Sequence, residues 1–298
     1  IDIVHRLVAE NQSDLEIALT ADDILRIHSE GKIASLIGIE GGHAIENSLA
    51  TLRMLYQLGA RYMTLTHSKG LSWADSATDV RQVGGLTEFG VEVVKEMNRI
   101  GMLVDLSHVS SSTMDQALDA SSSPVIFSHS SAASVTKHPR NVSDEVLLRL
   151  KKNNGIIMIT FFPSYISQRV DQAWKDIQEK AKKTPGTPEE RRQFFFEQVS
   201  SDLAPKASIK DVADHIDHVR NLIGSDFIGL GSDYDGMPGA PTGLEDVSKF
   251  PALFVELLRR GYSEAEIEKI AGKNLLRVMR ENERNSLELQ AKKNQEEG

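Results

Sequence analysis

The sequence contains no cysteine, which excludes disulfide bonds and metal sites built from thiolates and leaves the redox compartment open. It also lacks an excess of basic residues, since 34 Lys and Arg stand against 43 Asp and Glu, a net charge of −9. This balance argues against nucleic acid or an anionic membrane surface as a partner. No apolar run approaches the roughly 18 residues that a transmembrane helix needs.

The amino end lacks the features of a natural start. The opening IDIVHRLVAE has neither an initiator Met nor a signal-peptide pattern, and it resembles the interior of a helix. We therefore expect the sequence to begin inside a longer protein. Localisation stays open between the cytoplasm and, with a signal peptide upstream, the periplasm or secretion.

Length and composition predict one large hydrophobic core. A chain of 298 residues with 40% hydrophobic residues is an ordinary size for a single α/β domain. We expect residues 1–298 to form one such domain. Within it, the charge-rich segment 164–210 is interpreted as a helical insertion, and 284–298 as a polar tail that frays.

The stretch 101–131 contains a strand–helix–strand unit. Two apolar runs, MLVDLSH and PVIFSHS, end in His108 and His129 and flank a segment that begins with helix-capping hydroxyl residues. Near-continuous apolar strands joined through a helix indicate a parallel sheet that is buried on both faces. Enzymes of this kind place their chemistry at the carboxyl ends of such strands.

The same alternation of strand and helix extends over the whole chain and predicts six strands. They end near Glu40, His67, His108, His129, Phe162 and Asp233. Five of these six residues can bind a metal or move a proton, and a (β/α)8 TIM-like barrel would bring all strand ends to one face. Because such a barrel has eight strands and the first visible element is a helix, we expect the first two strands to be missing from this chain.

Three of these residues form a candidate metal site. Glu40, His108 and His129 supply one carboxylate and two imidazoles, a common ligand set of catalytic zinc. The two oxygens of Glu40 could also bridge two metals that share a hydroxide nucleophile. Taken singly, either histidine is as readily explained by a structural role; together they favour a metal site.

Three further residues are candidates for catalysis and substrate binding. Asp233 is suited to shuttle a proton, and His67 to donate a hydrogen bond to a developing oxyanion. Arg140, in the loop after His129, suits a substrate carboxylate because its planar guanidinium can bind one bidentately. A surface ion pair is the alternative for Arg140. The remaining histidines considered are interpreted as structural: His43, His138, His215 and His218.

Several motifs resemble the renal (membrane) dipeptidase family of zinc peptidases. They occur in the order IEGGH, TLTHS, LVDLSHVS, PVIFSHSSA, HPRNV, GLGSDYDG and GLEDVSK. The resemblance covers residues 1 to about 283. It implies a (β/α)8 barrel that hydrolyses dipeptides at a site with two Zn2+ ions.

The resemblance also implies a role for each candidate residue. Glu40 matches the bridging carboxylate, and His108 with His129 matches the histidines of the second zinc. His67 matches the histidine near the tetrahedral intermediate. Arg140 matches the group that binds the substrate carboxylate, and Asp233 matches the acid/base aspartate.

The sequence departs from the family pattern in one respect. The family holds its first zinc with a His-x-Asp pair at the end of the first strand, and the only similar string, His215-Ile216-Asp217, lies in an expected helix. The chain therefore supplies ligands for one zinc and the bridging carboxylate.

The insertion at 164–210 resembles bacterial-type members. The disulfide-linked, lipid-anchored dimer of mammalian members is not carried over, and a homodimer remains one open possibility.

Two alternatives compete with a zinc dipeptidase. One is another barrel metallohydrolase, such as a lactonase or an amidohydrolase-like enzyme. Arg140 distinguishes them, because a clamp for a free carboxylate has no function with a neutral ester. The other alternative is an inactive, truncated remnant. Dipeptide preference, and acceptance of D-residues or β-lactams, stay open.

The chain expressed alone is expected to be poorly soluble, to bind at most one zinc tightly and to show no appreciable dipeptidase activity. A barrel without two strands exposes two sheet edges, which favours aggregation, and admits water to the site. Metal analysis combined with a dipeptide hydrolysis assay checks this expectation. Two zincs per chain with normal turnover would contradict it.

Overall fold

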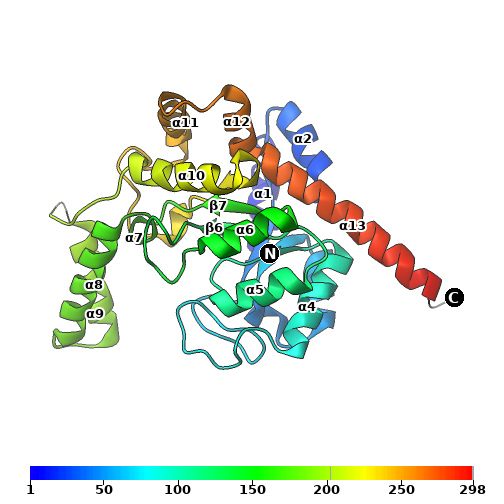
Figure 1. Cartoon of the computed structure of the whole chain (residues 1–298), viewed down its shortest axis with the longest axis horizontal. Helices are drawn as coiled ribbons and strands as arrows, with labels where there is room; N and C mark the ends of the chain where they lie inside the picture. Colours follow the sequence, from blue (N-terminus) through cyan, green and yellow to red (C-terminus); the bar gives the residue numbers. More distant parts are fainter. Residues whose placement is uncertain (202, 297–298) are drawn as a thin grey trace. The chain divides into compact units, whose positions relative to one another are not determined.

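The computed structural model describes residues 1–201 and 203–296. Helices and strands alternate along most of this length, and Figure 1 draws them coloured by their order in the sequence. The strands are β1 (Leu15–Ile17), β2 (Ile33–Ser35), β3 (Ile37–Glu40), β4 (Ala60–Thr64), β5 (Leu103–Asp105), β6 (Ile126–Ser130), β7 (Ile156–Ile159) and β8 (Ile228–Leu230). The α-helices are α1 (Asp2–Glu10), α2 (Ala21–Ser29), α3 (Leu49–Gln57), α4 (Glu88–Ile100), α5 (Ser111–Ala120), α6 (Asp144–Asn153), α7 (Pro163–Ile166), α8 (Gln168–Lys183), α9 (Pro188–Ser200), α10 (Ile209–Ile223), α11 (Phe250–Arg259), α12 (Glu264–Glu268) and α13 (Asn274–Glu296).

Six of the strands form one sheet in the order β3-β4-β5-β6-β7-β8. The register of the first three aligns Glu40 with Thr64, and Thr64 with Asp105, in parallel pairs. Helices connect successive strands, as parallel pairing requires. The α/β class and the six-stranded parallel sheet expected from the sequence are therefore confirmed.

A second sheet was not anticipated. Strands β1 and β2 pair in parallel and flank α2, and each contains only three residues. Neither strand has a fully buried position. Such short, partly exposed segments lack the apolar run by which the longer strands are recognised.

Helix α4 illustrates why the predicted helices form where they do. Thr87 caps its first turn by accepting a hydrogen bond from Gly90 N–H, and Val93, Val94 and Met97 are buried on its inner face. The helix ends at Gly101, whose φ of 85° lies in the left-handed region. The chain then enters β5 two residues later.

The chain divides into two compact units. The first comprises Ile1–Phe127, Arg149–Ile156 and Lys273–Gly298, and the second comprises Ser128–Leu148 and Ile157–Gly272. Strands β6 and β7 each contribute residues to both units. A single barrel domain over 1–298 stays a prediction.

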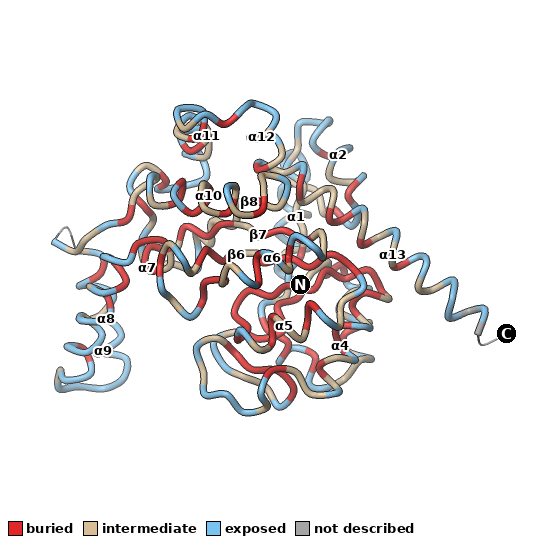
Figure 2. Tube along the Cα trace, viewed as in Figure 1, coloured by how far each residue is buried: buried red, intermediate tan, exposed pale blue. Residues whose placement is uncertain are grey.

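Two segments singled out in the sequence are helical. The segment 164–210 contains α8 and α9, whose residues are mostly exposed (Figure 2). Helix α13 continues beyond residue 284, where fraying was expected. Ser286 Oγ and Gln290 Nε2 both donate to the Arg99 carbonyl, and these bonds fix the helix in this region. No helix among the described residues is long and apolar enough to span a membrane.

His215 is structural, as expected, although it lies on the buried face of α10. Its Nδ1 accepts a hydrogen bond from Ala132 N–H at 3.0 Å, so the proton resides on Nε2, within 3.3 Å of Thr136 Oγ1 and of the Ile166 carbonyl. Burial lowers the pKa of His215 to about 4. The folded protein therefore keeps this ring neutral at a pH where an exposed histidine takes up a proton.

We expect His215→Gln to lower the free energy of unfolding at pH 7 by about 1–3 kcal/mol, because buried hydrogen bonds are lost. Between pH 6.5 and about 4 the parent protein should lose stability as the pH falls, since only the unfolded chain protonates this ring. That slope is at most about 1.4 kcal/mol per pH unit for one group, and the variant should lack it.

Urea denaturation at pH 7, 6 and 5 measures both effects. His28→Gln is the control, because His28 is exposed on α2 and should change neither the stability nor its pH dependence. An equally steep acid loss in His215→Gln would show that His215 is not responsible.

Candidate metal centre

Glu40 is the last residue of β3, and the two glycines that follow it allow the chain to turn sharply. Gly41 has a φ of 115°, and a Cβ there would lie 2.4 Å from the His43 ring. A Cβ at Gly42 would lie 2.6 Å from the Leu65 carbonyl. Only glycine fits this turn, which leaves the Glu40 side chain about half exposed at the strand end.

His67 and His108 follow the next two strands at matching positions. Each lies three residues beyond the register pair Thr64 and Asp105. His108 Nε2 lies 3.1 Å from Glu40 Oε1, and His67 Nε2 lies 3.8 Å from Glu40 Oε2. The two imidazole centroids are 4.5 Å apart. The structure thus brings together three of the residues that the sequence placed at strand ends.

His129 lies on β6, the strand that pairs with β5. One ligand atom each from Glu40, His108 and His129 lies within 4.8 Å of the other two. The Ser128 hydroxyl lies 2.7 Å from His129 Nδ1. If Nδ1 carries the proton and donates to Ser128, the lone pair resides on Nε2, as metal binding requires.

The geometry of this trio suits a metal ion. Two donors on one tetrahedral zinc, each at its usual bond length, lie about 3.3 Å apart. The Glu40–His108 separation of 3.1 Å already has this value. Glu40, His108 and His129 therefore form a possible metal site, and the role of each residue stays a prediction.

Arg140 lies in the second unit, in the loop after β6. Its side chain is only 1% exposed, and Nη2 donates to the His129 carbonyl at 3.3 Å. Its guanidinium carbon lies 5.2 Å from the centre of the Tyr165 ring. This burial disfavours the surface ion pair considered from the sequence.

The neighbouring His138 is partly buried. Desolvation lowers its pKa to about 4, and Asp171 opposes the shift while Arg140 adds to it. A neutral His138 accepts a hydrogen bond from Arg140 N–H through Nδ1. The loop therefore holds Arg140 through its backbone as well as through its side chain.

Asp233 follows β8 by three residues and has an uncommon backbone conformation. Its φ of 64° and ψ of 36° lie in the left-handed region, where His108 also lies with a φ of 71°. Non-glycine residues in this region are strained and are common at functional sites. Two of the candidate residues share this feature, which the sequence did not reveal.

Sequence reasoning missed the hydroxyl groups that contact the candidate histidines. Ser128 lies beside the His129 ring, and Thr66 Oγ1 donates to the His108 carbonyl at 3.2 Å. A signal was available, because a serine or threonine directly precedes each strand-end histidine, in Thr66-His67, Ser107-His108 and Ser128-His129.

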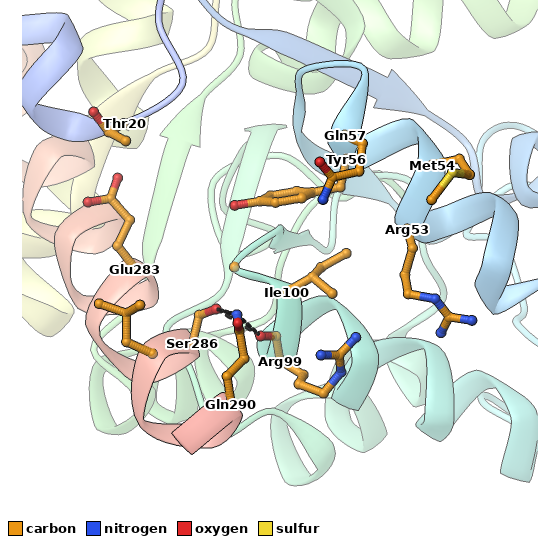
Figure 3. A pocket seen from close by; sticks show the side chains of 12 residues that line it. Thr20, Arg53, Met54, Tyr56, Gln57, Arg99, Ile100, Glu283, Ser286 and Gln290 are labelled. Carbon is orange, nitrogen blue, oxygen red and sulfur yellow. Dashed lines mark hydrogen bonds between the residues drawn. The ribbon is translucent and has the colours of Figure 1, made fainter. Parts of the chain in front are cut away.

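A cavity of about 540 Å3 in the first unit lies apart from these residues (Figure 3). It is lined by residues of α3, α4 and α13, among them Tyr56, Arg99 and Glu283. The lining residues of α3 and α4, such as Tyr56 and Arg99, lie just before β4 and β5, whereas His67 and His108 follow these strands. The cavity is therefore at the amino ends of these strands and is not part of the candidate site.

Comparison with known proteins identifies the family. The chain matches the model described as membrane dipeptidase (peptidase family M19) over residues 1–293. The chain belongs to this family. Among curated proteins, it is 46% identical over 282 residues to Dipeptidase tcpJ of Claviceps purpurea and 44% identical over 286 residues to Dipeptidase 3 of Rattus norvegicus. Each alignment covers 94% of this chain, but only 58% and 51% of those proteins. The chain thus spans little more than half the length of these relatives.

Solved structures agree with the family assignment. The probable dipeptidase PvdM from Pseudomonas aeruginosa has a TM-score of 0.85 at 26% identity, covering 95% of this chain and 78% of that one. A metallo peptidase from Rhodobacter sphaeroides, liganded with a phosphinate mimic of the dipeptide L-Ala-D-Ala, has a TM-score of 0.76 at 25% identity. That match covers 94% of this chain and 73% of the other. The α/β fold is that of the M19 dipeptidases, a TIM-barrel amidohydrolase fold.

Proposed function

We propose that this protein is a zinc-dependent dipeptidase that hydrolyses the peptide bond of dipeptides. The observation that carries the proposal is the cluster of Glu40, His108 and His129 at the strand ends of an M19 family member. The phosphinate dipeptide mimic in the Rhodobacter structure supports the same substrate class. The chain covers only 58% and 51% of the two curated relatives. Dipeptidase activity is therefore proposed for the whole protein.

Zinc is the metal that this donor set fits best. Two imidazole nitrogens and a carboxylate make a ligand set typical of catalytic zinc, and thiolates are absent. His108 is largely buried, which restricts its ring, while Glu40 is exposed and can present either oxygen. When bound, zinc would supply Lewis-acid polarisation of the scissile carbonyl and activation of water.

Proton transfer falls to Asp233 in this proposal. A carboxylate within reach of the attacking water takes up its proton and returns it to the leaving amine. The left-handed backbone of Asp233 fixes the direction of the side chain at the end of β8. Strained backbone conformations of this kind cluster at functional sites, where they help to orient a side chain.

His67 is suited to stabilise the oxyanion that forms during hydrolysis. Its side chain is 44% exposed, so a substrate can reach it, while its ring remains against that of His108. An N–H donor from this ring would be directed at the charge that develops on the carbonyl oxygen.

Arg140 would bind the free carboxylate of the dipeptide. A buried guanidinium attracts a carboxylate more strongly than an exposed one, because the surrounding dielectric constant is lower. This residue favours a dipeptide over the neutral ester of a lactonase-like alternative. The alternative of an inactive, truncated remnant is tested by measuring whether the protein hydrolyses dipeptides at all.

In a form of the protein that hydrolyses dipeptides, Asp233→Asn should retain its metal and lose most turnover. An amide keeps the shape of the side chain but cannot take up the proton, and general acid–base catalysis is typically worth about 10²–10⁴-fold. Zinc content and kcat measure the two effects. Asp235→Asn is the control, since Asp235 is exposed two residues away and should leave kcat unchanged. An unchanged kcat in Asp233→Asn would remove Asp233 from this role.

Arg140→Lys tests the proposed substrate class. The change should raise KM for dipeptides with a free carboxyl end, with a loss of about 1.5–3 kcal/mol, because a bidentate charged contact becomes a point charge. KM and kcat are measured for a dipeptide and for its carboxamide. The carboxamide should be a poor substrate of the parent protein and should hardly change with the variant. An equal loss for both substrates would make Arg140 a structural residue.

A further inference from the structure

Asp75 organises the long loop between β4 and α4. Its carboxylate is buried and accepts three backbone hydrogen bonds, from Gln82 and Val83 N–H to Oδ1 and from Gly85 N–H to Oδ2, at 2.7 to 3.1 Å. Burial alone would raise the pKa of Asp75, but these donors lower it below its usual range. The carboxylate therefore remains charged and holds residues 82–85 around it.

The backbone of Asp75 attaches the same loop to the start of α5. Its carbonyl accepts hydrogen bonds from Ser110 N–H at 2.9 Å and from Thr113 Oγ1 at 3.0 Å. Both contacts lie within the first unit. Asp75 is thus held from two sides, and the residue that follows it has little freedom to move.

That following residue, Ser76, contacts the backbones of both His67 and His108. Its hydroxyl donates to the His67 carbonyl at 2.7 Å and lies 3.3 Å from the His108 carbonyl. Ala77 N–H donates to the His108 carbonyl as well, at 2.7 Å. Ser76 is 2% exposed, so water cannot replace these bonds without a rearrangement of the loop.

These contacts hold the backbone of His108, whose conformation is uncommon. His108 has a φ of 71°, which side chains other than glycine rarely adopt. Its carbonyl is held by Ala77 N–H and the Thr66 hydroxyl, and lies beside the hydroxyl of Ser76. A carbonyl held in this way fixes the peptide plane that follows His108, and it therefore limits the directions in which the imidazole leaves the backbone.

We propose that Ser76 is a positioning residue of the metal centre, which sets the spacing between His67 and His108 by holding both carbonyls from one buried hydroxyl. The proposal rests on the proposed function, because it takes His108 as a metal ligand. Groups that orient a ligand typically change metal affinity by about 10–100-fold when they are removed. Ser76 would act through the backbone of His108 and touches no metal or substrate itself.

Cobalt(II) titration of the whole chain tests this proposal without any need for turnover. Co2+ bound to histidine and carboxylate absorbs visible light, so the spectrum reports ligand geometry and the titration reports affinity. We expect Ser76→Ala to bind Co2+ about tenfold or more weakly than the parent chain, with a changed spectrum.

The control is Ser286→Ala. Ser286 is also a buried serine whose hydroxyl donates to a carbonyl, that of Arg99 at 2.8 Å, but it lies on α13 beside the cavity of Figure 3. It should lose a similar amount of stability by circular dichroism and bind Co2+ as the parent does.

Thr66→Val removes another contact to the His108 carbonyl with little change in side-chain shape. It should weaken Co2+ binding in the same direction and decides the question if Ser76→Ala does not fold.

The outcomes separate this proposal from the one on which it rests. If the parent chain binds no Co2+, the metal centre is wrong and the positioning role falls with it. If the parent binds Co2+ while the folded Ser76→Ala or Thr66→Val variant gives the same affinity and spectrum, the positioning role alone is overturned. Weaker binding in Ser286→Ala, equal to that in Ser76→Ala, would likewise show an effect of stability and not of position.

Discussion

The parallel register of β3, β4 and β5 is the constraint on which the candidate metal centre depends. Hydrogen bonds between these strands align Glu40, Thr64 and Asp105 in one row. Because strand side chains alternate between faces, a slip of one residue would turn each of them to the opposite side. The row therefore fixes where the chain leaves the sheet. This in turn fixes the backbone positions of the short segments that place His67 and His108 beside Glu40.

Beyond the strands, the centre is held by backbone carbonyls and buried hydroxyl groups. The His108 carbonyl is held by hydrogen bonds from the loop and from Thr66, and the loop is held in turn by the buried carboxylate of Asp75. Buried polar groups of this kind are stable only when they are paired, so the network tolerates few alternative arrangements. In this arrangement the side chains of Glu40 and His67 are exposed, whereas that of His108 is largely buried.

Much of the sheet and part of the site could be predicted from sequence. The apolar runs before Glu40, His67 and His108 are long enough to show strands, and their alternation with helices indicates parallel pairing. The three-residue strands β1 and β2 could not be predicted, since their pairing depends on a contact between residues 15–17 and 33–35 and not on a local pattern. His215 was expected in a helix, but its burial and its contacts with Ala132 and Thr136 depend on residues about 80 positions away in the chain and could not be predicted.

The residue types at the strand ends and the family of the chain could be read from the amino-acid order, because strand-forming runs and motifs are local patterns. The tertiary structure alone decided the 3.1 Å approach of Glu40 to His108, the burial of Arg140 and the contact of Ser76 with two histidine backbones. Each of these depends on residues that are distant in the chain. Their separation is set by strand register and loop packing, which no local pattern of side chains encodes.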